Sequence, residues 1–456
     1  MFGSGFWCSR VAGAGFAVVL LALVPWQTAR ADTFPVETAT LPNGLQVVVI
    51  PDHRAPIVTQ IIYYKIGSSD SPVGLSGLAH MLEHMMFQGT STTPGSVFHS
   101  AVAIHGGDEN AFTQNDVTAY HQTVGKEALE LVIQLESDRM HNLTISESAF
   151  RSELQVVEEE RRMRTENTPG GLFSEQFGAA QYLAHPYGLP TIGWMGDIER
   201  YTREDAVAWY TTWYVPNNAV LVFAGDTTLA EVLPLVQRYY GPVPSRATPP
   251  RIRAQEPPQL AERRVIFRDS RVRQPSITRS YIAPTRNARD GMAAPLSMLA
   301  QILSGGTGRL NQSLVIGQKI AAGAGAGYGA GSMDPSTFTF SASVGRNGDI
   351  AVLETALDAE IAKLLKDGVT QEELDRVKNG IDASYTYGRD QVQSLARVVG
   401  GGLAIGLTMA EVQSWPEELK RVTVDDVNKA ARAVLVRPHA VTGLLLPDTA
   451  DFAAVR

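Results

Sequence analysis

The sequence predicts an α+β fold built from two homologous domains that arose by internal duplication, each a mostly antiparallel sheet covered by helices. Two observations favour this fold class. Short strand-like runs alternate with long helical patterns in both halves of the chain. Segments of the first half also recur in the second at offsets near 220 residues, which is typical of a duplicated domain.

The expected strands are short runs rich in β-branched and apolar residues. They cover Leu45–Ile50, Ile57–Lys65, Val220–Phe223, Thr337–Val344 and Val441–Leu446. The expected helices repeat apolar residues at three- and four-residue spacing. They cover Leu75–Met86, Lys126–Arg139, Glu147–Arg164 and Asp349–Lys366. Long helices between short strands indicate sheets with helices packed over them.

The duplication is clearest around two tryptophans. Trp194 to Thr202 reads WMGDIERYT and Trp415 to Thr423 reads WPEELKRVT, at an offset of 415 − 194 = 221. Two further segments match in the same order: His80–Thr90 with Ser297–Thr307 (297 − 80 = 217) and Glu153-Leu154 with Glu373-Leu374 (373 − 153 = 220). Three matches at similar offsets favour duplication over chance similarity between amphipathic helices.

The N-terminus predicts a signal peptide over residues 1–31, cleaved near Ala31, and therefore a periplasmic or secreted protein. Arg10 precedes an uncharged, mostly apolar run from Val11 to Val24. That run is shorter than the roughly 20 apolar residues of a membrane span, which disfavours an uncleaved anchor. We expect domains at 32–243 and 264–456, joined by a Pro- and Arg-rich linker at 244–263.

Composition excludes several classes of function. With 44% hydrophobic and 19% charged residues, the chain resembles ordinary globular proteins. A net charge of −8 and the lack of a long basic run argue against nucleic acid as a partner. No later stretch is apolar enough to predict membrane association after signal cleavage. Cys8, the only cysteine, lies in the signal, so no disulfide or cysteine ligand is expected in the mature protein.

The strongest chemical signal is the run His80-Met81-Leu82-Glu83-His84. On a helix, histidines at i and i+4 lie on one face, so both imidazoles can reach one ion. Glu83 lies beside them, as in the inverted zinc motif H-x-x-E-H, where the carboxylate takes a proton from metal-bound water. The alternative is a structural pair of surface histidines.

Catalytic zinc usually takes three protein ligands and a water molecule, so a third ligand is expected from elsewhere. A second predicted helix carries Glu153, Val157 and Glu160 on one stripe, at i, i+4 and i+7. Partly buried carboxylates on such a stripe need a cation. Glu160 is the favoured ligand and Glu159 the competing choice, whereas Glu158 is expected on a solvated face.

The second copy lacks this chemistry. Ser297, Ala300 and Gln301 stand where the first copy has His80, Glu83 and His84, and Gly380 corresponds to Glu160 at the offset of 220. The first half therefore carries the predicted metal site, and the second half is a degenerate copy without metal ligands.

The chain resembles the pitrilysin-type metallopeptidases, the group that includes insulin-degrading enzyme and mitochondrial processing peptidase. Similarity covers nearly all of the mature chain. The motifs that carry it are the H-x-x-E-H run continuing to Thr90, Asn110 to Thr113 leading to Tyr120, Glu153 to Arg162 followed by Asn167 and Pro169, His185 to Tyr187, and Tyr214 to Asn218.

The resemblance implies one Zn²⁺ per chain, ligated by His80, His84 and Glu160, with Glu83 as the catalytic base and Glu153 as a supporting carboxylate. It also implies that Asn110–Thr113 is an edge strand to which an extended peptide substrate adds as an extra strand. Asn110 and Phe112 are the candidate peptide contacts. Without the resemblance, a polar loop and a core aromatic are about as good an interpretation.

The resemblance also implies a partner, because full-length relatives join four such domains into a chamber and this chain has two. Many active relatives carry a substrate-contacting arginine and tyrosine, seven residues apart, in the second half. Val315 and Ala322 occupy the matching positions, and neither offers a donor, although Arg309 or Tyr328 could compensate. A sister subunit that supplies the pair is therefore favoured, as a heterodimer, with a homodimer as the alternative.

The predicted function is that of an exported zinc-dependent endopeptidase that hydrolyses peptides or unfolded segments. Two alternatives are a non-catalytic binding or assembly subunit on the same fold and a different metal-dependent hydrolase.

Overall fold

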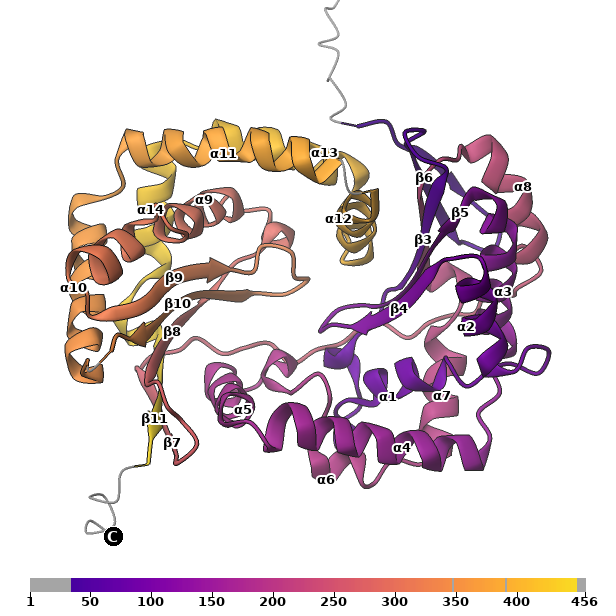
Figure 1. The fold of residues 1–456 in the computed structure, drawn as a ribbon, viewed down its shortest axis with the longest axis horizontal. Coiled ribbons are helices and arrows are strands. Elements are labelled where there is room, and N and C mark those ends of the chain that lie inside the picture. The colour runs from indigo at the N-terminus through magenta and orange to yellow at the C-terminus, as the bar shows by residue number, and fades with distance from the viewer. Residues whose placement is uncertain (1–33, 347, 390–391, 449–456) are drawn as a thin grey trace, which may run out of the picture. The chain divides into compact units, whose positions relative to one another are not determined.

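The computed structural model of the chain describes residues 34–346, 348–389 and 392–448 (Figure 1). The predicted signal peptide, residues 1–31, and Cys8 lie outside the described residues. Residues from Phe34 onward form one compact unit. The predicted domain limits at 243 and 264 remain a prediction.

The first half forms a six-stranded sheet in the order β1-β2-β6-β3-β5-β4. Its strands are β1 Glu37–Thr40, β2 Gln46–Pro51, β3 Ile57–Tyr64, β4 Asp108–Thr113, β5 Thr118–Gly125 and β6 Ala219–Gly225. Only β2 and β6 pair in parallel; the other neighbours are antiparallel. Strand β6 is apolar and buried along its whole length because both faces of the sheet are covered.

The second half repeats this sheet with five strands in the order β7-β11-β8-β10-β9. They are β7 Arg263–Asp269, β8 Ser276–Ala283, β9 Ala321–Tyr328, β10 Ser336–Val344 and β11 Ala440–Pro447. Apart from β1, the two orders correspond strand for strand, and the parallel pair β7–β11 occupies the place of β2–β6. The predicted α+β fold with two homologous domains is confirmed.

Fourteen α-helices among the described residues cover these sheets. In the first half they are α1 Leu78–Met85, α2 Gly95–Ile104, α3 Leu129–Asn142, α4 Glu147–Arg161, α5 Pro169–Gln181, α6 Met195–Ile198, α7 Arg203–Trp213 and α8 Leu229–Tyr239. In the second half they are α9 Ala293–Leu303, α10 Ile350–Asp367, α11 Gln371–Arg389, α12 Val392–Ala404, α13 Met409–Arg421 and α14 Val424–Val434. No single described helix is long and apolar enough to span a membrane, although the bent pair Gln393–Ala404 and Met409–Arg421 together meet that length and composition.

Helices α5 and α12 each pack on the sheet of the other half. Helix α12 contacts β3 and β6, and α5 contacts β7 and β11. A glycine permits each close approach. A Cβ on Gly400 of α12 would lie 2.3 Å from the Tyr63 ring, and one on Gly443 of β11 would lie 2.5 Å from the Phe177 ring. Each half has its own main core, and a third apolar cluster contains residues of both halves.

The positions at which α4 and α11 begin change the offset between these two matching segments. Ser146 caps α4 and Thr370 caps α11, each by accepting a hydrogen bond from the backbone three residues on, so the offset here is 370 − 146 = 224 rather than 220. A match of only two residues, Glu-Leu, had set the earlier value. At the structural offset the position equivalent to Glu160 is Ser384, not Gly380. Serine offers no carboxylate, so the second copy still lacks all three predicted ligands.

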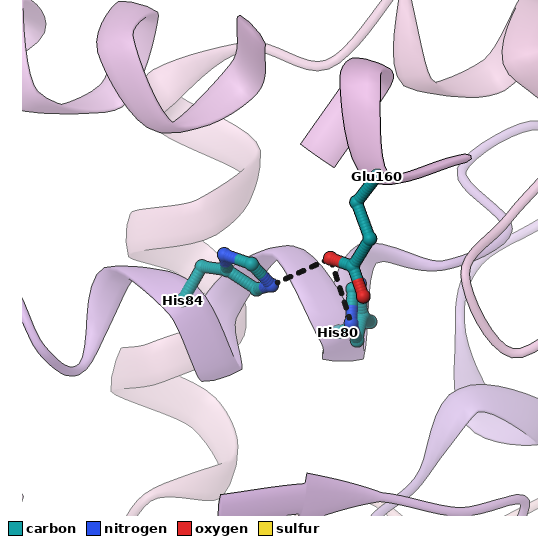
Figure 2. Close-up of side chains that lie close together, drawn as sticks. All are labelled: His80, His84 and Glu160. Atoms are coloured by element: carbon teal, nitrogen blue, oxygen red, sulfur yellow. Dashed lines mark ion pairs between the residues drawn. The ribbon is translucent and has the colours of Figure 1, made fainter. Parts of the chain in front are cut away.

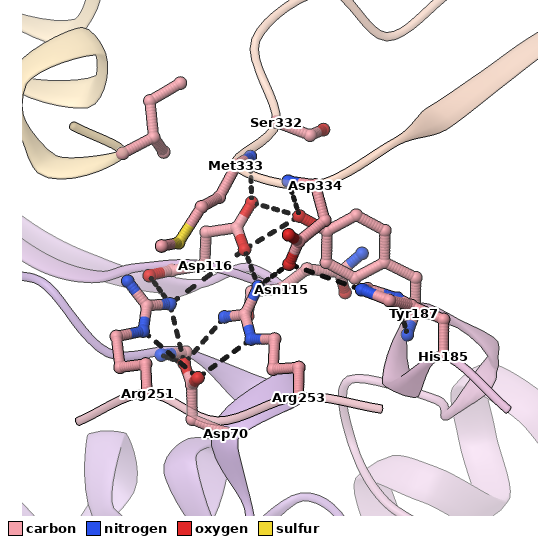
Figure 3. Close-up of polar contacts among 12 residues, drawn as sticks. Asp70, Asn115, Asp116, His185, Tyr187, Arg251, Arg253, Ser332, Met333 and Asp334 are labelled. Carbon is pink, nitrogen blue, oxygen red and sulfur yellow. Dashed lines mark hydrogen bonds and ion pairs between the residues drawn. The ribbon is translucent and has the colours of Figure 1, made fainter. Parts of the chain in front are cut away.

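Residues 244–262 of the predicted linker contain no helix or strand, and the central part of this segment makes several ion pairs (Figure 3). We call residues Arg251–Glu256 the strap. The side chain of Arg253 is only 4% exposed. It pairs with Asp70 at 2.8 Å and Asp116 at 2.6 Å in the first half, and with Asp334 at 2.8 Å in the second. These ion pairs tie the two halves together.

Candidate metal centre

Helix α1 presents two imidazoles on one face. His80 lies in its first turn and His84 in its last, and their ring centroids are 4.7 Å apart. His80 is buried, with 8% of its surface exposed, and His84 is half-buried. The spacing of i and i+4 on a helix places them there, as the sequence predicted.

Helix α4 brings a carboxylate to the same point (Figure 2). The Glu160 Oε2 atom lies 3.2 Å from His84 Nε2 and 3.8 Å from His80 Nε2. One ligand atom from each of these three residues lies within 4.8 Å of the others. The competing candidate, Glu159, has a side chain that is 60% exposed and pairs with Arg162 at 3.3 Å. The structure thus brings Glu160, and not Glu159, to the histidines.

The donor set fits a zinc ion. Two imidazole nitrogens and one carboxylate oxygen form the His₂Glu set of many catalytic zinc sites. Around a tetrahedral ion with bonds near 2.1 Å, such donors lie roughly 3.4 Å apart, so the separations here need only small side-chain adjustments. A cleft beside the three donors leaves room for further ligands.

Glu153 lies behind His84 on the side away from Glu160. Its Oε2 atom is 3.2 Å from His84 Nδ1, and its Oε1 atom accepts a hydrogen bond of 2.7 Å from Gln88 Nε2. A carboxylate on Nδ1 fixes the ring so that Nε2 faces the ion. Glu153 therefore has the geometry of a positioning residue, which agrees with the supporting role that the family resemblance implies.

Glu83 is half-buried beside the two histidines and is held by strand β4. Thr113 Oγ1 donates a hydrogen bond of 2.6 Å to Glu83 Oε2. In the described part of the chain, Glu83 Oε1 makes no hydrogen bond or ion pair. Burial raises the pKa of Glu83, and the hydrogen bond from Thr113 opposes part of that rise.

The two histidines differ in charge although they are neighbours. Burial, followed by the proximity of His84, lowers the pKa of His80 to about 4. Burial also lowers the pKa of His84, but its contacts with Glu153 and Glu160 outweigh burial and raise that pKa to about 9. The hydrogen bond to His84 in turn lowers the pKa of Glu160. Without a metal, positive charge at this point thus resides on His84.

These side chains open into a cleft of about 1000 Å³. Strand β4, the edge strand of the first sheet, forms one wall of the cleft. Both predicted peptide contacts, Asn110 and Phe112, line the cleft. Asn110 is exposed. Phe112 is half-buried, and its ring packs edge-on against Tyr63 with centroids 6.1 Å apart. Phe112 therefore also has the packing role that the alternative interpretation gave it.

Three residues of the site were not among the predicted ones. Thr113 holds Glu83, Gln88 holds Glu153, and Arg164 NH1 lies 2.5 Å from Glu160 Oε1. All three line the cleft. Arg164 is four residues after Glu160, a spacing visible in the sequence. It lies in a π-helical turn, Arg162–Glu166, that directly follows α4, and such turns are frequent at functional sites.

The residues considered as substitutes for the missing arginine and tyrosine are engaged elsewhere. Arg309 pairs with Glu373 at 2.6 Å, and the Tyr328 hydroxyl donates to the Pro284 carbonyl. Neither is among the described residues that line the cleft. Val315 lies in a π-helical turn, Asn311–Gly317, and Ala322 lies in β9.

Comparisons with known proteins agree with this site and fold. Residues 46–193 match the family model of insulinase (peptidase family M16), and residues 200–381 match that of the peptidase M16 inactive domain. A zinc protease of Helicobacter pylori, PqqE, is 29% identical over 417 residues, which cover 90% of this chain and 93% of that protein.

Solved structures show the same fold. A protease from Helicobacter pylori superposes with a TM-score of 0.85 at 28% identity, covering 90% of this chain and 99% of that one. The periplasmic protease PqqL from Escherichia coli gives 0.78 at 22% identity, but this chain covers only 48% of it. With two matching domains in tandem, the chain belongs to the pitrilysin-type peptidase family M16.

Proposed function

We propose that this chain is an exported zinc-dependent endopeptidase, with His80, His84 and Glu160 as the metal ligands. The observation that carries the proposal is the convergence of two imidazoles and a carboxylate from separate helices, within 4.8 Å, beside a half-buried carboxylate at Glu83. Zinc proteases among the relatives support the choice of metal. Export is supported by the signal-like N-terminus.

The residues divide the chemistry as follows. Zinc, when bound, supplies a Lewis acid for the scissile carbonyl and lowers the pKa of a bound water to about 7. Thr113 holds one oxygen of Glu83, which leaves Oε1 to accept a proton from water in the cleft. The same carboxyl then delivers the proton to the departing amine. Glu153 keeps His84 oriented throughout.

Strand β4 supplies the binding surface for the substrate. Its inner edge pairs with β5, and its other edge is free of strand partners in the described sheet. An extended peptide can therefore pair with β4 and place one of its bonds beside Glu83, since Thr113 of β4 contacts Glu83 directly. Most extended segments of folded proteins already pair within their own sheets, so peptides and unfolded chains are the expected substrates.

We further propose that a second subunit completes the cleft. This chain covers about half of PqqL and 45% of pitrilysin. Val315 and Ala322 offer no side-chain donor, and Arg309 and Tyr328 are engaged outside the cleft. A sister chain that supplies the arginine and tyrosine, in a heterodimer, is favoured over a homodimer. Co-purification of the exported protein and its solution mass distinguish the two.

The test of the catalytic proposal is the Glu83→Gln variant. It should retain about one zinc per chain and lose cleavage of an internally quenched peptide, because the ligands are intact and the base is absent. Ester and phosphoester substrates assayed in parallel separate a peptidase from another hydrolase. Peptide binding with zinc and no cleavage by the wild-type protein, alone or with its sister subunit, would indicate a binding subunit instead.

A further inference from the structure

Among the described residues, Arg397 is a cation without an ion-pair partner beside β4, the proposed peptide-binding strand. It lies on α12, and its side chain is solvent-accessible. Its guanidinium carbon is 4.9 Å from the ring centroid of Phe112 on β4. No carboxylate among the described residues lies within 4.0 Å of it, whereas other described arginines, such as Arg253 and Arg309, pair with one.

A buried histidine holds this guanidinium in place. Arg397 NH2 lies 3.0 Å from His121 Nε2, and His121 is 4% exposed on β5. The other ring nitrogen, Nδ1, lies 3.2 Å from the side-chain amide of Gln393, one turn earlier on α12. Two side chains of α12 thus each contact one of the two ring nitrogens of His121.

The protonation state of the His121 imidazole follows from its two hydrogen-bond partners. Arginine only donates, so Nε2 must accept, and a neutral ring then carries its proton on Nδ1. The amide atom placed beside Nδ1 is Gln393 Nε2, and a neutral ring cannot accept at both nitrogens, so a proton on Nδ1 requires this amide to turn its oxygen toward the ring. Burial, followed by the charge of Arg397, lowers the pKa of His121 to about 4, so the ring is neutral at pH 7. The arginine keeps its full charge; Asp108, on the same face of β4, acts on His121 through its charge but makes no ion pair with Arg397 among the described residues.

The position of Arg397 matters because of strand alternation. Asn110 and Phe112 point to one face of β4, and Ala111 and Thr113 to the other, where Thr113 contacts Glu83. His121 is the cross-strand partner of Asn110 and lies on the same face. A peptide added to the free edge of β4 alternates in the same way. Every second side chain would lie on the face that Arg397 covers.

Docking of α12 does not require this charge. The helix is already packed on the sheet through Ala396, Val399 and the close contact of Gly400 with Tyr63. A long apolar side chain at position 397 would cover Phe112 equally well. An ordered and unpaired cation is better explained by a ligand that carries the opposite charge.

We propose that Arg397 is a specificity-determining residue that selects peptides with an acidic side chain at the positions facing α12. The proposal rests on the peptidase function proposed above. It differs from the arginine and tyrosine expected from a sister subunit, because this cation belongs to the chain that carries the metal site. His121 and Gln393 act as positioning residues.

The test is a scan of one quenched peptide with Glu, Gln or Lys at successive positions. In the wild-type protein, kcat/KM should be about five-fold higher for Glu than for Gln at alternate positions, and lowest for Lys. Arg397→Gln should abolish this preference, and Arg397→Lys should retain part of it. The preference should weaken as salt is raised, because the group is exposed.

Arg200→Gln, which removes an exposed arginine that is not among the described residues lining the cleft, is the control and should keep the preference. Equal rates for Glu and Gln peptides in the wild-type protein, or an unchanged preference in Arg397→Gln, would refute the proposal. Affinities of the same peptides for the Glu83→Gln variant, from fluorescence anisotropy, provide a readout that needs no cleavage. A protein that prefers Glu peptides in binding but cuts none would contradict the peptidase function and support the role of Arg397.

Discussion

The Glu153→Gln variant tests whether this carboxylate orients His84, a proposed metal ligand. The carboxylate serves two neighbours at once: Oε2 lies 3.2 Å from His84 Nδ1, and Oε1 accepts from Gln88 at 2.7 Å. A glutamine side chain has the same shape but only one acceptor oxygen. The variant can keep both neighbours only if Gln88 turns its own amide to accept, and in every case it loses the negative charge that faces His84 Nδ1.

The expected loss of zinc affinity in Glu153→Gln follows from the role of Glu153 as a hydrogen-bond partner of a histidine ligand. Loss of an outer carboxylate on a metal-binding histidine lowers metal affinity by roughly 10- to 100-fold. This corresponds to about 1.4–2.8 kcal/mol. Removal of a direct ligand, as in Glu160→Gln, should lower the affinity much further, because only two donors remain.

The assay is competition for zinc between the purified protein and a chromophoric chelator at fixed pH. Glu158→Gln is the matched control, since Glu158 lies on the same helix but pairs with Arg162 at 3.0 Å. It should bind zinc like the wild-type protein. An affinity of Glu153→Gln equal to that of the control would show that Glu153 does not orient His84. A loss as large as that of Glu160→Gln would show that it is a ligand.

Three further predictions concern the catalytic base and the strap. Thr113→Val removes the hydrogen bond to the charged form of Glu83, so the pKa of Glu83 should rise. The acidic limb of the pH profile of kcat/KM should then move to higher pH while the zinc content stays unchanged. An acidic limb at the wild-type pH would contradict this. Arg253→Gln removes a cation that pairs with the carboxylates of Asp70, Asp116 and Asp334, of which the first two are buried. The variant should lower the free energy of unfolding in urea by about 3–5 kcal/mol. Arg200→Gln, at a side chain that is 64% exposed, should change it by less than about 0.5 kcal/mol, and equal losses would refute the role of the strap. His185 Nε2, 3.2 Å from Asp334 Oδ2, holds the pKa of Asp334 at about 2, against burial and with further help from Arg253. This is below the unfolded value of about 3.9, so its contribution to stability is complete above pH 4 and disappears as the pH falls through 2. Asp334→Asn should flatten the stability curve between those limits, and an unchanged slope would contradict the assignment.

Local chemistry was predictable because it depends on the spacing along one helix. His80, Glu83 and His84 share α1, and helix geometry alone fixes how they face one another. The capped helix starts at Thr202 and Thr423 were equally visible, and both form capping boxes. The duplicated fold was predictable from matching segments and is confirmed by two sheets of corresponding strand order.

Contacts between distant elements were harder to predict. The choice between Glu159 and Glu160 depends on the rotation of α4 about its axis, where one residue turns a side chain by about 100°. Packing on α1 sets that rotation, with Val157 buried in the core. The sequence did not predict a role for Thr113 or Arg397, because each contacts a residue of another element: Thr113 contacts Glu83, and Arg397 contacts Phe112.

The sequence by itself determined the fold class, the H-x-x-E-H run on one helix and the half of the chain that carries it. These follow from periodicity and from repetition, both of which are local properties of the chain. The tertiary structure alone decided which glutamate joins the histidines, that α5 and α12 cover the opposite sheets, and that the strap ties the halves together. The physical reason is that these outcomes depend on which surfaces pack and exclude water together, and residues far apart in sequence bring those surfaces into contact.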